Sequence, residues 1–256
     1  MSTPIRQENL LMSTGLSLPL LRDLVPGSIE YGTMLMVEFE PDALWYESSL
    51  TIAAQAVKEG RKTVYHVFEH PPDDVRSFLC NLGLDVEKLE DDGLFHIVDS
   101  FTVQTGLGFP KHKAGWTDGG ADRSLRLWDW SLEAGQILKA GFREEWKNWL
   151  HIDENFGILL QYNPEKLVVD FARTRALPEA RDQKQISLHS FVKGVASESF
   201  YKQFESLCDG IIEFKTQEID GEIGNLLRVR ALRGRKHDTK WHKLELLDNG
   251  EVTVAD

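Results

Sequence analysis

The chain has 256 residues and a formal net charge of −12, with 41% hydrophobic and 27% charged residues. This length suits one large α/β domain or two small ones, and the composition is that of a folded globule and excludes a disordered chain. The acidic excess disfavours general coating of nucleic acid, because phosphate backbones are also negative. No apolar run reaches the roughly 18 residues that span a bilayer, and the distant Cys80 and Cys208 fit reduced thiols. We therefore expect a cytoplasmic protein that has no membrane segment.

The first part of the chain predicts a βαβ unit. Residues 1–12 are expected to form a flexible N-terminal segment, and residues 13–256 a single domain. An apolar strand ending at Phe39 is followed by a turn, by a helix whose apolar residues recur with a 3.6-residue period, and by a strand from Thr63 to Phe68. Nucleotide-binding proteins place a glycine-rich loop with Lys and Ser or Thr at such a turn. Here the frame of a phosphate site is present and the residues of that site are absent.

The middle of the chain predicts two further strands around a long loop. A helix starting at the prolines 71–72 leads to a strand over 94–98, and a second strand over 149–153 ends in an acidic pair. Between them, the glycine-rich stretch from Gly106 to Gly120 reads as a surface loop. A tryptophan-rich stretch over 125–149 follows it and is expected to be partly helical. Asn163 is expected to be the N-cap of the next helix, with Pro164 at its first position.

The last third changes from alternating strands and helices to strands alone. A strand over 186–192 and a helix over 197–208 are followed by three stretches in which apolar and polar residues alternate, within 211–215, 226–232 and 244–246. Such alternation is typical of antiparallel strands with one solvent-facing side. The whole pattern predicts an α/β three-layer sandwich with a mostly parallel central sheet and a C-terminal antiparallel β-meander at one edge.

Several stretches, taken in order and spacing, resemble the KaiC-like members of the RecA/RadA ATPase superfamily over roughly residues 13–254. They are Thr14-Gly15-Leu16 with Pro26-Gly27-Ser28, Lys58 to Tyr65 with Phe68-Glu69, Leu82 to Asp85 with Asp92 to Asp99, Leu207 to Glu213, and Arg233 to Asp238. The resemblance implies a RecA-like central sheet and an ancestry among ATPases.

The phosphate loop of this family does not match the chain. The loop needs glycines so that its backbone amides close around phosphates, a Lys for the β and γ oxygens, and a Ser or Thr for Mg²⁺. At the matching positions the chain has Phe39, Asp42 and Leu44 for the glycines, Trp45 for the Lys and Tyr46 for the hydroxyl residue, and Pro41 alone fits. We therefore expect a degenerate loop whose phosphate space is filled by Trp45, and no bound cofactor, with ATP and Mg²⁺ as the alternative.

Other catalytic positions of the family are partly kept. Asp153 matches the carboxylate that orients Mg²⁺-bound water, and Glu69 matches one of two adjacent catalytic glutamates, with His70 in place of the second. Arg233 matches a basic residue that reaches a neighbouring subunit's nucleotide, and Ala231 replaces its Lys partner. The resemblance implies that Glu69, Asp153 and Arg233 are vestigial. The alternative is a structural role for each, as a cap, an ion pair or a solvated charge.

Two further groups of residues carry candidate chemistry. His66 and His70 could pair with Asp153 or Glu69 as acid and base, or be core and capping residues, and His237 with His242 reads as a turn more readily than as a metal site, so no metal is expected. The basic residues near the C-terminus could bind nucleic acid or an acidic partner, or form a solvated strand face: Arg228, Arg230, Arg233, Arg235, Lys236, Lys240 and Lys243.

These observations favour a catalytically inactive KaiC-like protein that regulates or scaffolds a signalling or DNA-linked ATPase assembly. Its partner would be a second copy of itself or an active KaiC-like paralogue. Two alternatives stay open: a KaiC-like ATPase that binds nucleotide at a non-standard phosphate site, and a nucleic-acid accessory factor similar to RadA paralogues.

Overall fold

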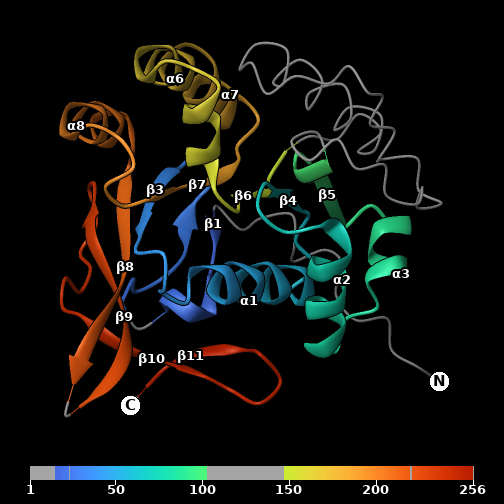
Figure 1. Cartoon of the computed structure of the whole chain (residues 1–256). Helices are drawn as coiled ribbons and strands as arrows, with labels where there is room; N and C mark the ends of the chain where they lie inside the picture. The colour runs from blue at the N-terminus through green and yellow to red at the C-terminus, as the bar shows by residue number, and fades with distance from the viewer. Residues whose placement is uncertain (1–14, 23, 103–146, 220, 256) are drawn as a thin grey trace, which may run out of the picture.

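A computed structural model describes residues 15–22, 24–102, 147–219 and 221–255 (Figure 1). The predictions for residues 1–12, for the Gly106–Gly120 loop and for the tryptophan-rich stretch up to residue 146 lie outside these ranges. Within the described ranges, none of the helices combines the length and the apolar character needed to cross a membrane.

In the described part of the chain, nine strands form a central sheet in the order β11-β10-β9-β8-β3-β7-β6-β4-β5. Strands β8, β3, β7, β6, β4 and β5 run parallel to one another, and β9, β10 and β11 continue the sheet beyond β8 with antiparallel pairings. The predicted meander at one edge is thereby confirmed. The strands are β3 (Met34–Phe39), β4 (Thr63–Val67), β5 (Phe95–Asp99), β6 (Leu150–Asp153), β7 (Ile186–Val192), β8 (Gly210–Ile219), β9 (Glu222–Leu232), β10 (His242–Leu246) and β11 (Val252–Val254), and a separate pair joins β1 (Gly15–Leu16) to β2 (Ile29–Glu30).

Helices cover both faces of the sheet, which confirms the three-layer sandwich (Figure 1). One face carries α1 (Trp45–Lys58), α2 (Pro72–Asn81) and α3 (Val86–Asp91). The other carries α6 (Glu165–Phe171), α7 (Leu177–Asp182) and α8 (Glu198–Leu207). Short 3-10 turns lie at Pro19–Leu21 and Phe156–Gln161, and one π turn at Ala172–Ala176 joins α6 to α7.

The alternation of side chains along β3 divides the core in two. Leu35 and Val37 pack into the cluster that contains α1, whereas Met34 and Met36 pack into the cluster beneath α6 and α8. Successive residues of a strand point to opposite faces, so a strand buried on both sides reads as a continuous apolar run. The run from Met34 to Val37 is such a strand, and it lies in the interior of the sheet between β8 and β7.

The predicted cap of α6 is wrong. The helix begins at Glu165, and its N-cap is Pro164, with φ −59° and ψ 142° and no side-chain capping bond. The side chain of Asn163 turns the other way and donates to the carbonyl oxygen of Leu159 at 2.8 Å. That carbonyl oxygen also accepts from the backbone amide of Tyr162 at 3.2 Å. The side chain of Asn163 therefore adds a bond to the end of the preceding 3-10 turn, and this local side-chain-to-backbone bond replaces the cap.

Strand order decides which side chains meet at the edge where the parallel strands end. Helix α1 follows β3 and leads to β4, yet β7 and β6 lie between these two strands. The carboxyl ends of β3, β7, β6 and β4 therefore lie along one edge, which is where α/β folds of this kind bind ligands. Residues 39–46, 66–70, 151–154 and 189–190 all lie on these strands or directly after them.

Candidate functional site

The turn between β3 and α1 is held by hydrogen bonds from its own backbone amides. The amide of Ala43 donates to the carbonyl oxygen of Glu40 at 3.0 Å, and that of Trp45 donates to the carbonyl oxygen of Ala43 at 2.7 Å. The amide of Leu44 donates to Oδ1 of Asn225 in β9 at 3.1 Å. A phosphate loop works by pointing such amides at the anion. Here three consecutive amides are committed to acceptors within the protein.

Trp45 is the first residue of α1 and is 2% exposed. Its ring centroid lies 5.3 Å from that of Phe214 and 6.2 Å from that of Phe39. Its Nε1 donates to the carbonyl oxygen of Glu154 at 2.7 Å. The indole therefore fills the space between the turn and the end of β6, at the position where the resemblance calls for the phosphate-binding Lys.

A buried carboxylate, that of Glu154, accepts hydrogen bonds from the backbone amides at the end of β4. Oε2 of Glu154 accepts from the backbone amides of Phe68 at 2.6 Å, Glu69 at 2.8 Å and His70 at 3.4 Å. Converging backbone amides of this kind form an anion site, and Glu154 is the anion that occupies it. Its other oxygen pairs with Nδ1 of His70, and this hydrogen bond raises the pKa of His70. The side chain of His70 therefore pairs with Glu154, and not with Asp153 or Glu69, the partners that the acid–base alternative named.

Tyr46 closes this side of the site. Its ring stacks on the imidazole of His70, with centroids 3.9 Å apart and an angle of 20° between the planes. The edge of Phe78 from α2 lies against the same ring, at a centroid distance of 6.0 Å. Tyr46, at the position to which the resemblance assigns a Mg²⁺-binding Ser or Thr, is thus half-buried in an aromatic stack.

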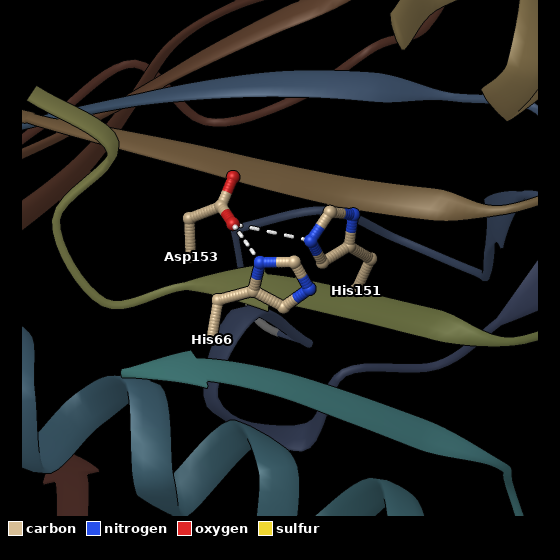
Figure 2. A group of neighbouring side chains, drawn as sticks. All are labelled: His66, His151 and Asp153. Carbon is tan, nitrogen blue, oxygen red and sulfur yellow. Dashed lines mark hydrogen bonds and ion pairs between the residues drawn. The ribbon is translucent and has the colours of Figure 1, made fainter. Parts of the chain in front are cut away.

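Three histidines surround the carboxylate of Asp153, which is fully buried at the end of β6. Oδ1 lies 3.3 Å from Nδ1 of His66 in β4 and 3.1 Å from Nε2 of His151. Figure 2 marks both contacts by dashed lines. Oδ2 lies 2.5 Å from Nδ1 of His189 in β7. Strand register explains the meeting, because His66 is the registered partner of Asp153 across β4 and β6, and His151 precedes Asp153 by two residues on the same face.

Burial sets the protonation of this cluster. It lowers the pKa of His66 to about 3, and the nearby His151 adds to the effect. Burial alone would raise the pKa of Asp153, but the charges and hydrogen bonds of His151 and His189 outweigh it and lower that pKa well below its usual value. At neutral pH the cluster therefore holds one carboxylate beside a neutral His66.

The three residues predicted as vestigial do not all meet. Glu69 lies next to Glu154 through its backbone amide, and Asp153 is the residue before Glu154. Arg233 follows β9, where its amide donates to the carbonyl oxygen of Asp209 and its guanidinium donates to the carbonyl oxygen of Ser206 at 2.8 Å. Since Asp209 directly precedes β8 and binds the amide of the first residue of β3, Arg233 lies at the opposite end of the sheet from Asp153.

The predicted basic patch is largely engaged within the chain. Arg228 pairs with Glu213 and lies over Trp241, 4.4 Å from the ring centroid. Arg230 lies 3.0 Å from Glu38, 2.6 Å from Glu205 and 3.3 Å from Glu213.

The rest of the patch divides between one tethered arginine and three lysines. Arg235 donates to the carbonyl oxygen of Ser28 and lies 3.6 Å from Glu30. No ion pair within the described ranges involves Lys236, Lys240 or Lys243. Charge available to an outside partner therefore comes chiefly from these lysines.

His237 and His242 do not share a metal geometry. Nε2 of His242 lies 3.4 Å from a carboxylate oxygen of Asp238, and Nδ1 of His237 lies 3.0 Å from the carbonyl oxygen of Arg235. In the part of the chain that the structure describes, the group of three metal-ligating side chains with donor atoms within 4.8 Å of one another is instead His66, His151 and Asp153.

Sequence reasoning missed the roles of Glu154, His151 and His189. The two-residue period of a strand places His151 beside Asp153 and would have predicted that pair. The contact of His189 with Asp153 and that of Glu154 with the end of β4 depend on β6 lying between β4 and β7. No local pattern carries that order.

Comparison with known proteins finds similar sequences and a similar solved structure. No family model matches the chain. It is 23% identical over 252 residues to a UPF0273 protein of Aeropyrum pernix, covering 93% of this chain and 92% of the relative. It is 26% identical over 212 residues to a UPF0273 protein of Pyrococcus furiosus, covering 77% and 75%.

Among solved structures, the KaiC-like protein PH0186 of Pyrococcus horikoshii superimposes on the chain with a TM-score of 0.67 and 19% identity. The match covers 95% of this chain and 98% of that one. The resemblance to KaiC-like proteins is thus confirmed at the level of the fold.

Proposed function

We propose that this chain, which has the fold of a KaiC-like protein, is a non-hydrolysing member of an ATPase assembly that it regulates or scaffolds. The observation that carries the proposal is the occupied turn between β3 and α1. Trp45 fills the position of the phosphate-binding Lys, and the amides that would face phosphate donate to protein acceptors instead.

Energetics support the loss of nucleotide binding at this turn. Displacing a buried Trp costs roughly 3–5 kcal/mol, and breaking three backbone hydrogen bonds costs about 1 kcal/mol each. A ligand of micromolar affinity gains roughly 8 kcal/mol in all. The opening cost is therefore close to the whole binding energy of an ordinary nucleotide, before any repulsion between its phosphates and the carboxylate of Glu154.

A surface on the C-terminal meander supports a binding role. The hairpin of β8 and β9 carries Ile219 and Ile223 on either side of its turn, and Ile223 is 77% exposed. A large apolar side chain at the tip of a long hairpin suits contact with a second protein. The partner in this proposal is another copy of the chain or an active KaiC-like paralogue, in the cytoplasm and away from the membrane.

Mixing the purified chain with an active KaiC-like ATPase from the same organism tests this role. We expect a complex in analytical ultracentrifugation and a changed rate of ATP hydrolysis by the paralogue, with no hydrolysis by the chain alone. Ile223→Ser should weaken assembly, whether with the paralogue or with itself. Val195→Ser is the matched control, since Val195 is 58% exposed on a loop before α8. A monomer that leaves the paralogue unchanged contradicts the proposal.

Hydrolysis of ATP by the chain itself would also contradict the proposal. If the purified protein turned over ATP and Asp153→Asn abolished the activity, the chain would be a KaiC-like ATPase with a non-standard phosphate site.

A further inference from the structure

The cluster around Asp153 has the composition of a transition-metal site. Two imidazole nitrogens and one carboxylate oxygen come from β4 and β6, and His66 and Asp153 are 2% exposed or less. Strands hold all three side chains, so their positions are fixed by sheet register and do not depend on a loop. Figure 2 shows the two imidazole rings turned toward the same oxygen of Asp153.

The spacing of the donor atoms is compatible with a shared metal ion. Zinc binds imidazole nitrogen and carboxylate oxygen at about 2.0–2.1 Å, and a tetrahedron with such bonds places neighbouring ligand atoms about 3.3–3.4 Å apart. Oδ1 of Asp153 lies 3.3 Å from the nitrogen of His66 and 3.1 Å from that of His151. The His151 contact is a hydrogen bond at the long end of the usual range of about 2.7–3.2 Å, and the His66 contact lies just beyond that range.

His189 is a hydrogen-bond partner of the Asp153 carboxylate, as is usual for carboxylates that bind metals. Its Nδ1 lies 2.5 Å from Oδ2 of Asp153, the oxygen that faces away from the other two histidines. Such a contact fixes the rotation of the carboxylate and leaves Oδ1 aimed between His66 and His151. His189 is therefore a positioning residue for the site.

We propose that His66, His151 and Asp153 bind one first-row divalent metal ion of the zinc class, with His189 orienting Asp153. Two nitrogen ligands select such an ion over Mg²⁺, which prefers six oxygen ligands. Three protein ligands leave a fourth position for water or a small anion. This inference goes beyond the proposed function and does not depend on it, because the ion needs neither nucleotide nor partner.

Metal titration of the full-length protein tests the site. The protein is stripped with a chelator and titrated with Zn²⁺ by calorimetry and with Co²⁺ by visible absorption. We expect one equivalent per chain, the intense bands of tetrahedral Co²⁺ with nitrogen and oxygen ligands, and a higher Tm for the loaded protein. Millimolar Mg²⁺ should not displace the ion. Sub-stoichiometric binding, displacement by Mg²⁺ or a thiolate-to-cobalt band overturns the proposal.

Variants then locate the ion. His151→Gln and Asp153→Asn are expected to weaken Zn²⁺ binding by more than about 100-fold, and His189→Gln by about 10- to 100-fold. His96→Gln is the matched control, because His96 is also buried on a neighbouring strand but is not in the cluster. His242→Gln controls for the surface histidines. Equal losses in His96→Gln and His151→Gln, or loss in His242→Gln alone, contradict the assignment. If a cluster variant fails to fold, the cobalt spectrum of the unaltered protein decides.

Discussion

Truncation of Trp45 tests the claim that this side chain is part of the core. Trp45→Ala removes a ring that is 2% exposed and packs against Phe39 and Phe214. Loss of a buried aromatic ring costs about 3–5 kcal/mol of unfolding free energy. The carbonyl oxygen of Glu154 loses the indole donor but keeps the hydroxyl of Ser190 at 2.7 Å, so the lost hydrogen bond adds only about 1 kcal/mol.

Equilibrium unfolding in urea measures these costs. Trp45→Phe keeps most of the ring and loses the donor, and it should cost about 1–2 kcal/mol. Trp241→Ala is the matched control, because Trp241 lies partly exposed under Lys215 and Arg228 and its loss should cost about 1 kcal/mol or less. A cost below about 1 kcal/mol for Trp45→Ala would mean that the indole is not packed as described. The proposal that Trp45 fills the space for phosphate would then be wrong as well.

Two further substitutions test the buried acids near the sheet edge. Burial raises the pKa of Glu38 to about 7, with Arg230 opposing the shift, so its stabilising contribution is present at low pH and is lost as the pH rises from about 4.5 through 7. Glu38→Gln should therefore be neutral near pH 5 and stabilising by about 1–3 kcal/mol at pH 8 in urea unfolding, and a stability gain that is the same at both pH values would refute this. Glu154→Gln should cost about 1–3 kcal/mol, because three backbone amides lose a charged acceptor. An unchanged urea midpoint would show that those amides do not depend on the carboxylate.

The fold could be predicted from sequence because its signals are local. The strand over 186–192 and the helix over 197–208 follow from the two-residue and 3.6-residue periods, and the structure places β7 and α8 within one residue of those bounds at each end. The edge meander follows from alternation alone. Asn163 was predicted wrongly, because its side chain donates to the carbonyl oxygen of Leu159 in the preceding 3-10 turn, a contact that a capping preference does not reveal.

The candidate site was predicted in part. The bulky residues at the turn after β3 are visible in the sequence, and so is the acidic pair after β6. The partner of each carboxylate is not, because His189 meets Asp153 and His70 meets Glu154 only through the order of strands far apart in the chain. The ion pairs within the basic patch could not be predicted either, because Glu38 and Glu213 lie more than a dozen residues from Arg230 in the sequence.

Calorimetric titration with Mg²⁺ and ATP measures whether the chain binds nucleotide. We expect no saturable heat up to millimolar ATP, because Trp45 fills the turn between β3 and α1 and the amides of that turn donate to acceptors within the protein. Saturable binding in the micromolar range, weakened by Asp153→Asn, would contradict this expectation and would show that the chain still binds nucleotide.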